Sequence, residues 1–318
     1  MHPAYSIIFF TTAAGAGYGL LFLGGLGAAF ELLPPARWLG LALLGLALGL
    51  VSLGLAASTF HLGHPERAWR ALSQWRSSWL SREGVMAIAT YLPAGLFAIG
   101  WVFLEQTGGL WGLLGLLAAA GAVITVYCTA MIYASLKPIR QWHHPLTAPL
   151  YLLFALASGA LLLMAVVHLL GGAAAAARWS ELLVLLSLAL AWGVKLIYWH
   201  RIDSGRSAST PETATGLAGL GKVRLLDPPH TGENYLLREM GYRLGRKHAG
   251  KLRRLALLSG LALPFALTLV ASFAGGWLGA ALALLAALSG LTGIVLERWL
   301  FFAEATHSVM LYYGAREV

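Results

Sequence analysis

The sequence predicts an all-α integral membrane protein built as a bundle of eight transmembrane helices. Its 318 residues are 58% hydrophobic and 11% charged, whereas about a quarter of the residues in soluble domains are charged. Eight apolar stretches come close to the roughly twenty residues with which a helix crosses the bilayer core. Long apolar runs of this kind exclude a disordered chain and also an outer-membrane barrel, whose strands alternate apolar and polar residues.

The expected helices follow one another with short connections over most of the chain. The pair Pro34–Pro35 stops the first stretch, and glycine pairs at 108–109, 171–172 and 275–276 mark three later turns. Glycine and alanine recur within the stretches, which lets helices approach closely in lipid. The expected spans are residues 5–30, 38–60, 83–104, 111–135, 147–170, 181–199, 255–275 and 277–302. The chain therefore divides into six helices (1–199), a long loop (200–254), and two helices with a tail (255–318).

Lysine and arginine residues are distributed unevenly between the two ends of these helices. An even number of spans puts both termini on the same side. Eighteen of the 22 lysines and arginines fall on that side, Arg37 and Arg178 fall on the other, and the remaining two, Lys195 and Arg298, lie in helix ends. The positive-inside rule therefore predicts that both termini and the loops 61–82, 136–146 and 200–254 are cytoplasmic. Topology then accounts for the net charge of +9, and we expect no nucleic-acid partner.

Two ionisable residues flank the loop 61–82 at the membrane edge. His61 ends the second expected helix and Glu83 begins the third. Ionisable groups at membrane depth are rare and usually functional, so both are candidate site residues. Glu83 also has a structural interpretation, in which Ser81 caps the helix and the carboxylate favours the helix dipole. His64, three residues after His61, leaves open a metal site with two local ligands.

The loop between His61 and Glu83 mixes tryptophan with arginine. Such a segment is typical of an interfacial amphipathic stretch, in which tryptophan lies at headgroup depth and arginine binds lipid phosphates. The alternative is a surface that binds a ligand or a partner. The residues concerned are Arg67, Trp69, Arg70, Trp75, Arg76 and Trp79.

The histidines and the single cysteine limit the cofactors that this chain can hold. One cysteine, Cys128, excludes a disulfide framework and a cysteine-ligated iron–sulfur cluster. A haem bound by two histidines needs imidazoles at similar depth, whereas His61 and His168 lie at opposite edges of the bilayer. His307 can reach the depth of His61, so a single haem stays open. We expect His168 to be an interfacial histidine.

Two other residues near span ends have both a functional and a structural interpretation. Tyr133 is able to hydrogen-bond a ligand, but tyrosines also form the aromatic belt at this depth. Lys195 is expected to snorkel toward water. The centres of the expected spans hold no charged residue, which argues against a transporter, because charges near the midplane are expected at its substrate site.

The loop 200–254 is too long to be a simple connection. Proline, glycine and threonine make its first half a segment of turns or extended chain, and a basic helical pattern follows from residue 236. We expect this loop to be a docking platform for a partner. The alternative is a basic helix lying on anionic lipid.

Three motifs together resemble a known family. They are the corner His61-Leu62-Gly63-x-Pro65, the helix start Leu80-Ser81-x-Glu83, and the tract Thr-Gly-Glu-Asn-Tyr-Leu-Leu-Arg-Glu-Met-Gly at 231–241. With the eight spans, they make essentially the whole chain similar to the anchor subunit of the dimethyl sulfoxide reductase family. Members of that family are the integral membrane subunits of quinone-linked molybdenum enzymes.

The resemblance implies a quinone (ubiquinone or menaquinone) as cofactor, with no haem and no metal in this chain. It implies two partners, an iron–sulfur subunit with four clusters and a molybdopterin catalytic subunit, besides membrane lipid. The family's quinol-site histidine matches His61, and its carboxylate matches Glu83. We add Arg67 and Tyr133 as further quinone-binding candidates. The candidate docking residues are Arg70, Arg76, Tyr235, Arg238 and Arg243.

The predicted function is to pass electrons between the partner's clusters and the quinone pool of the bacterial inner membrane. The chain would be a subunit of a quinone-dependent oxidoreductase without the catalytic molybdenum centre. The cytoplasmic bias and the 231–241 tract favour the sulfite-oxidising branch. The alternatives are an anchor of a dimethyl sulfoxide or S- or N-oxide reductase that oxidises menaquinol, a structural anchor without quinone, and a polytopic transporter.

Overall fold

The computed structural model describes residues 4–59, 64–171, 174–205, 209–227, 229–230, 232 and 247–316. In these residues eight helices are long and apolar enough to cross a membrane, which confirms the predicted number of spans. They are α1 (Tyr5–Ala29), α2 (Arg37–Thr59), α3 (Trp79–Ala98), α4 (Gly109–Ala134), α5 (Thr147–Leu169), α6 (Ala174–Ser204), a helix made of α10 (Ala249–Leu257) and α11 (Leu263–Ala271), and α12 (Gly276–Ala303).

Shorter helical elements connect or extend these spans. Two π-helical turns, η2 (Ile99–Phe103) and η4 (Leu258–Ala262), continue α3 and join α10 to α11. The 3-10 helix η1 (Pro65–Gln74) precedes α3. Beyond α6 lie α7 (Pro211–Thr215) and η3 (Ala218–Leu220), and η5 (Ser308–Tyr313) follows α12. The first half of the long loop therefore contains two short helical turns.

Three helix starts lie four or more residues before the prediction, those of α3, α6 and α10, and α10 begins at Ala249 and not at residue 255. Helix α6 begins seven residues before the predicted residue 181, because an alanine run precedes the apolar core and alanine favours helix. Helix α3 begins at Trp79, and its N-cap is Ser78, whose hydroxyl accepts from the Ser81 backbone N–H at 3.5 Å. The predicted cap at Ser81 is therefore wrong, and Glu83 lies beyond the first turn of the helix.

A proline explains the π-helical turn η4. Pro264 has no N–H to donate to the carbonyl of Gly260, one turn earlier. The indole Nε1–H of Trp192 on α6 donates to that carbonyl at 2.8 Å. Because lipid offers no hydrogen bonds, a freed carbonyl in a membrane helix needs such a partner inside the protein.

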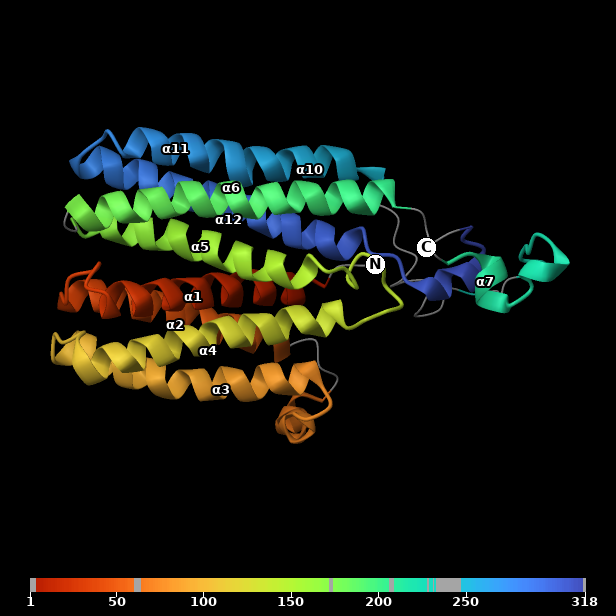
Figure 1. Cartoon of the computed structure of the whole chain (residues 1–318), viewed down its shortest axis with the longest axis horizontal. Coiled ribbons are helices and arrows are strands. Elements are labelled where there is room, and N and C mark those ends of the chain that lie inside the picture. Colours follow the sequence, from red (N-terminus) through yellow and green to blue (C-terminus); the bar gives the residue numbers. More distant parts are fainter. Residues whose placement is uncertain are drawn as a thin grey trace.

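The eight spans form two groups of four (Figure 1). Helices α1 to α4 make one group, and α5, α6, α10–α11 and α12 make the other; the main contact between them is α1 against α5. The N-terminal end of α1 and the C-terminal end of α12 lie at the same end of the bundle, as an even number of spans requires.

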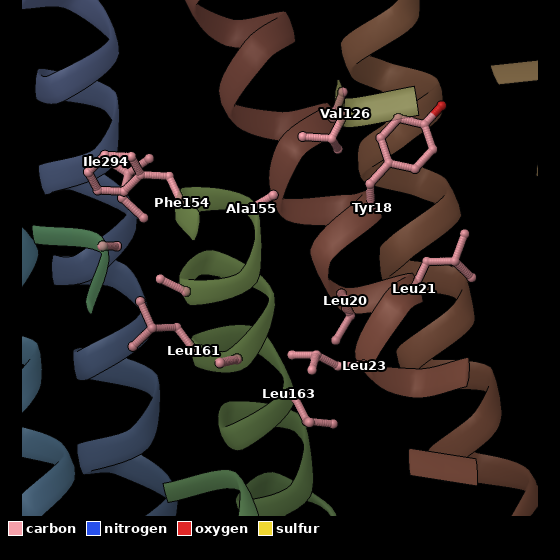
Figure 2. Packing of buried hydrophobic residues seen from close by; sticks show 14 of the residues in the cluster. Tyr18, Leu20, Leu21, Leu23, Val126, Phe154, Ala155, Leu161, Leu163 and Ile294 are labelled. Carbon is pink, nitrogen blue, oxygen red and sulfur yellow. The ribbon is translucent and has the colours of Figure 1, made fainter. Parts of the chain in front are cut away.

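Glycines allow the two groups to touch through their backbones. A Cβ atom placed on Gly19 of α1 would collide with the carbonyl oxygen of Ala155 on α5, and one on Gly159 would collide with the Gly19 backbone. Around this crossing, Leu20 and Leu23 of α1 face α5, and Leu161 of α5 faces α12 (Figure 2). Small residues at such crossings increase van der Waals contact between membrane helices.

Candidate functional site

The carboxylate of Glu83 is buried between α3 and α4, with 4% of the residue exposed. The hydroxyl of Thr129 on α4 donates a hydrogen bond to Glu83 Oε1. In the described part of the chain, no lysine, arginine or histidine forms an ion pair with this carboxylate. Burying a carboxylate without a cation is costly and favours its neutral form, which makes Glu83 a candidate for a functional residue.

Hydroxyl groups continue from this carboxylate into the bundle. Thr90 lies about two turns after Glu83 on α3, and Thr125 lies about one turn before Thr129 on α4. The Oγ1 atoms of these two threonines are 3.3 Å apart. Tyr91 on α3 contacts Ser52 on α2 at 2.6 Å. The buried hydroxyl of Tyr18 on α1 makes no hydrogen bond to the residues that the structure describes. Glu83 thus lies at one end of a set of hydroxyl groups contributed by four helices.

A small cavity joins the Glu83 side of the bundle to the second group of helices. Thr129, Tyr18, Tyr151 and Arg298 are among its lining residues, and its volume is about 20 Å³. This is space for about one water molecule. A quinone headgroup is far larger, so the cavity is suited to water. It extends the polar environment of Thr129 to the Arg298 guanidinium.

Of the other predicted ligand residues, the two that the structure describes, Arg67 and Tyr133, form no hydrogen bond or ion pair with Glu83. His61 lies outside the described residues. Arg67 is exposed on η1, 3.6 Å from the carboxylate of Glu66, which also contacts His64 at 3.1 Å. Of the described residues, no three histidine, cysteine, aspartate or glutamate side chains form a group that could hold a metal.

Tyr133 lies one turn after Thr129 on α4 but points into an aromatic cluster. Its ring is stacked with Tyr151 at 5.8 Å between centroids and packs edge-on against Trp142 at 5.2 Å and Phe302 at 5.3 Å. The side chain is buried. Tyr133 therefore belongs to the aromatic packing between α4, α5 and α12, one turn away from Thr129.

The segment before α3 is fixed to the start of that helix. The Ser81 hydroxyl donates to the Ala71 carbonyl, and the Arg82 guanidinium donates to the carbonyls of Trp75 at 2.9 Å and Arg76 at 2.7 Å. These bonds hold the segment beside the helix that carries Glu83. Residues 71–76 are thereby held in place next to the buried carboxylate.

Two of the five candidate docking residues are described, and both are exposed. The guanidinium of Arg70 lies 5.6 Å from the ring centre of Trp69, and that of Arg76 lies 5.6 Å from the ring centre of Trp75. Exposed arginine–tryptophan pairs suit either a lipid headgroup region or a partner surface. Tyr235, Arg238 and Arg243 lie outside the described residues.

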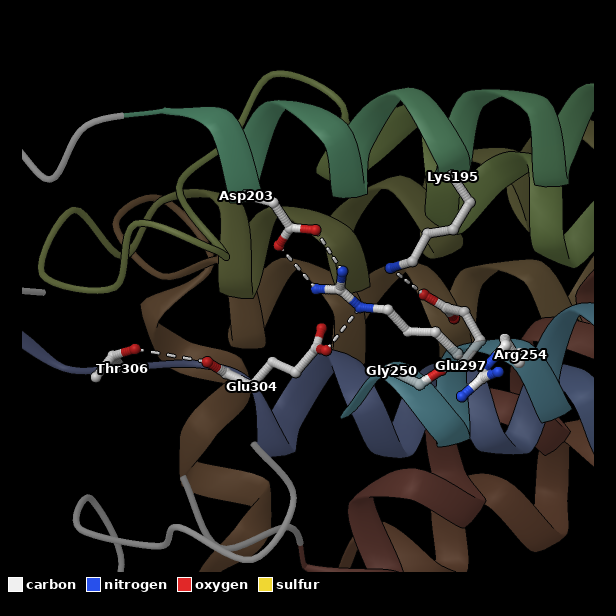
Figure 3. A network of polar contacts seen from close by, with 8 residues as sticks. Lys195, Asp203, Gly250, Arg254, Glu297, Glu304 and Thr306 are labelled. Carbon is white, nitrogen blue, oxygen red and sulfur yellow. Dashed lines mark hydrogen bonds and ion pairs between the residues drawn. The ribbon is translucent and has the colours of Figure 1, made fainter. Parts of the chain in front are cut away.

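A buried charged triad that was not predicted from the sequence lies between α6 and α12. Lys195 Nζ lies 2.6 Å from Glu297 Oε1, and Arg298 Nε lies 2.7 Å from Glu297 Oε2. All three side chains are at most 3% exposed. Figure 3 shows Lys195 and Glu297 pointing toward one another from facing helices. The prediction that Lys195 snorkels is therefore wrong, because its ammonium group is paired inside the bundle.

Aromatic rings surround the two cations of this triad. Lys195 Nζ lies 4.3 Å from the ring centre of Tyr198, and Arg298 Cζ lies 4.1 Å from that of Tyr151. Ring faces attract cations and provide partial solvation where water is absent. The signal in the sequence was three ionisable residues within apolar spans, a pattern that usually marks function or buried pairing.

Further polar contacts join helices near the two ends of the bundle. Arg253 on α10 forms ion pairs with Asp203 on α6 at 2.5 Å and with Glu304 after α12 at 2.8 Å; Figure 3 shows the carboxylates of Asp203 and Glu304 at the same guanidinium. At the other end His168 Nε2 lies 3.0 Å from Glu181 Oε1, and both side chains are nearly buried. His168 is therefore a paired histidine that joins α5 to α6.

These features define a multi-pass helical membrane protein with a buried carboxylate at one end of its bundle. Residues 1–220 match the model of the family described as DMSO reductase anchor subunit (DmsC). The chain is 35% identical to the C-subunit of sulfite dehydrogenase from Allochromatium vinosum (strain ATCC 17899 / DSM 180 / NBRC 103801 / NCIMB 10441 / D) over 331 aligned positions, covering 98% of this chain and 99% of that protein. The chain therefore belongs to the family of DMSO reductase anchor subunits, which confirms the resemblance drawn from its motifs.

Proposed function

We propose that this chain is the membrane anchor and quinone-binding subunit of a three-subunit molybdenum and iron–sulfur oxidoreductase that oxidises sulfite. The observation that carries the proposal is its full-length similarity to a sulfite dehydrogenase C-subunit. In this proposal, electrons pass from the partner's iron–sulfur clusters to the membrane quinone pool. The chain itself supplies the quinone site and the attachment to the membrane.

The buried carboxylate supports the quinone part of the proposal. A quinone, when bound, accepts two electrons and two protons. Glu83 is a titratable group held by Thr129 in a site that excludes bulk water, and such a group is suited to hold and move a proton. We assign to His61 a hydrogen bond to a quinone oxygen, because His61 and Glu83 flank the same loop at one end of the bundle.

The docking surface in this proposal consists of the loops 61–82 and 200–254. The first loop is fixed beside Glu83, so a partner bound there brings its clusters close to a quinone at this carboxylate. The partners are an iron–sulfur subunit with four clusters and a molybdopterin catalytic subunit. We place them at the cytoplasmic face of the bacterial inner membrane.

Purification of the tagged chain from its native membranes tests this function. We expect two hydrophilic subunits to co-purify, one holding molybdopterin and the other iron–sulfur clusters, and we expect the complex to reduce a ubiquinone analogue with sulfite. Dimethyl sulfoxide with reduced menaquinone is the matched comparison. Turnover with sulfoxide and none with sulfite would favour the reductase alternative, and a chain that purifies alone would reject both.

Cysteine labelling tests the cytoplasmic placement. In a Cys128→Ala background, Leu220→Cys and Phe273→Cys carry single thiols at positions that are 87% and 86% exposed. They lie at opposite ends of the bundle. We expect an impermeant maleimide added to intact spheroplasts to label the residue-273 variant at once, and the residue-220 variant after permeabilisation only. The reverse pattern would place the docking loops in the periplasm, because the positive-inside argument would then fail.

A further inference from the structure

A groove runs along the outer side of the bundle between α4 and α5. Its end hollow has a volume of about 440 Å³, and its inner hollow has a volume of about 180 Å³ and reaches Tyr18 and Gly19 of α1. The residues of α5 that line the two hollows recur with helical spacing, so they share one face of that helix. They are Ala148, Pro149, Leu152, Leu153, Ala155 and Leu156, and Pro145 lines the outer hollow just before the helix.

The dimensions of the groove match one leaflet of a bilayer. Leu156 lies eight residues after Ala148 on α5, which at 1.5 Å per residue is about 12 Å, and Pro145 extends the lining beyond the start of the helix. Half of a hydrocarbon core of about 30 Å is about 15 Å. The inner hollow is almost wholly apolar in its lining, and its lining residues belong to the membrane-spanning helices α1, α4 and α5. An acyl chain fits both its length and its chemistry.

The outer end of the groove carries hydrogen-bond donors. His143 is exposed, and its Nδ1–H donates to the Ala134 carbonyl at 2.6 Å. Its Nε2 accepts in the neutral ring and becomes a second donor when a bound anion keeps the ring protonated. His144 Nδ1 accepts from the Leu146 backbone N–H at 3.1 Å. A neutral His144 must therefore carry its proton on Nε2, where it is a donor.

The electrostatic surroundings of this end are positive. Partial burial lowers the pKa of His144, and the nearby cations Arg201, Arg140 and Lys195 lower it further. The loop 136–146 contains lysine, arginine and histidine but no acidic residue. Arg140 is held in place by bonds to the carbonyls of Ile202 at 3.2 Å and Gly205 at 2.8 Å. An anion at the groove mouth would be stabilised by this field.

The loop that carries the two histidines is firmly attached to the second group of helices. Trp142 Nε1–H donates to the Phe301 carbonyl at 2.9 Å, and the Tyr198 hydroxyl donates to the Gln141 carbonyl at 2.7 Å. The donors at the groove mouth are therefore positioned before any ligand arrives. Preorganised donors bind more tightly because less side-chain freedom is lost on binding.

We propose that this groove binds one anionic phospholipid, with its phosphate at His143 and His144 and one acyl chain along α4 and α5 to Tyr18. Basic pockets between membrane helices are known to bind anionic headgroups. A quinone shares the apolar tail, but its neutral headgroup gains little from the positive field. Because α4 and α5 belong to different helix groups, the phospholipid also seals the seam between them.

The purified complex, stripped of lipid in detergent, tests this proposal by native mass spectrometry with added phosphatidylglycerol or phosphatidylcholine. We expect one phosphatidylglycerol per anchor chain, bound about ten-fold or more tightly than phosphatidylcholine, as charge-assisted hydrogen bonds to the headgroup would give. Ala148→Trp fills the groove and should abolish this binding. Leu186→Trp, on an exposed face of α6 away from the groove, is the matched control and should retain it.

A second variant covers a folding failure of the first. His143→Glu changes an exposed side chain and should remove the preference for phosphatidylglycerol while the complex stays assembled. Equal binding of the two lipids by the unaltered complex would overturn the proposal, and so would unchanged binding by both groove variants. Labelling of Ala148 or Leu153 by a photoreactive quinone, blocked by excess quinone but not by phosphatidylglycerol, would assign the groove to quinone instead.

Discussion

Replacing Glu83 by glutamine is expected to lower quinone-linked turnover by about 10²–10⁴-fold, the contribution typical of a general acid or base. Glutamine keeps the size of the side chain and an oxygen that accepts the Thr129 hydrogen bond, but it carries no titratable proton. The measurement is sulfite-dependent reduction of a ubiquinone analogue across a range of pH. The pH profile should change as well, because the titrating group has been removed.

Two comparisons separate a role in proton transfer from a role in folding. Activity with an artificial electron carrier, which bypasses the quinone, should stay unchanged in the Glu83→Gln complex. Glu66→Gln is the matched control, because that carboxylate is exposed on the neighbouring loop, and its turnover should equal that of the unaltered complex. If Glu83→Gln keeps full quinone-linked turnover, the assignment of the site is wrong.

Replacing Glu297 by glutamine is expected to destabilise the protein by about 3–5 kcal/mol, as loss of one partner from a buried ion pair usually does. It leaves the ammonium of Lys195 and the guanidinium of Arg298 buried side by side without an anion. Replacing Lys195 by methionine should cost much less, because Glu297 then keeps its bond to Arg298 at 2.7 Å and the remaining pair is neutral.

Thermal unfolding of the two variants in the same detergent measures this difference. The glutamine variant should also accumulate less in membranes, since a loss of this size is a large part of the stability of most proteins. If Lys195→Met proves as damaging as Glu297→Gln, the triad is held by the cation–ring contacts of Lys195 and not by the charge balance around Glu297.

Composition and periodicity were sufficient to predict the helices, because each span has to be apolar over its own length. The boundaries followed to within two residues for five spans. They failed at α3, at α6 and at the helix made of α10 and α11, each of which begins four to seven residues before the apolar run. At α3 a serine three residues upstream of Ser81 caps the helix, and sequence alone does not distinguish two serines that both precede a helix.

The candidate site was only partly predictable. Glu83 stood out because a carboxylate near an apolar span is unusual. Thr129 did not, since threonine is common in membrane helices and its contact with Glu83 joins residues 46 positions apart. The same reason hid the partner of Lys195, because Glu297 lies on a distant helix and only the packing of α6 against α12 brings the two charges together.

The glycine crossing between α1 and α5 has a consequence for motion. At this point the backbones of the two helix groups are in contact, with no side chains between them that could change rotamer as the groups move. Rocking one group against the other would either force backbone atoms together or open a gap in the apolar core. Alternating access in transporters depends on such rocking. The backbone contact at Gly19 and Gly159 instead opposes movement of one group against the other. This suits the proposed role of holding a quinone at a constant distance from its electron donor.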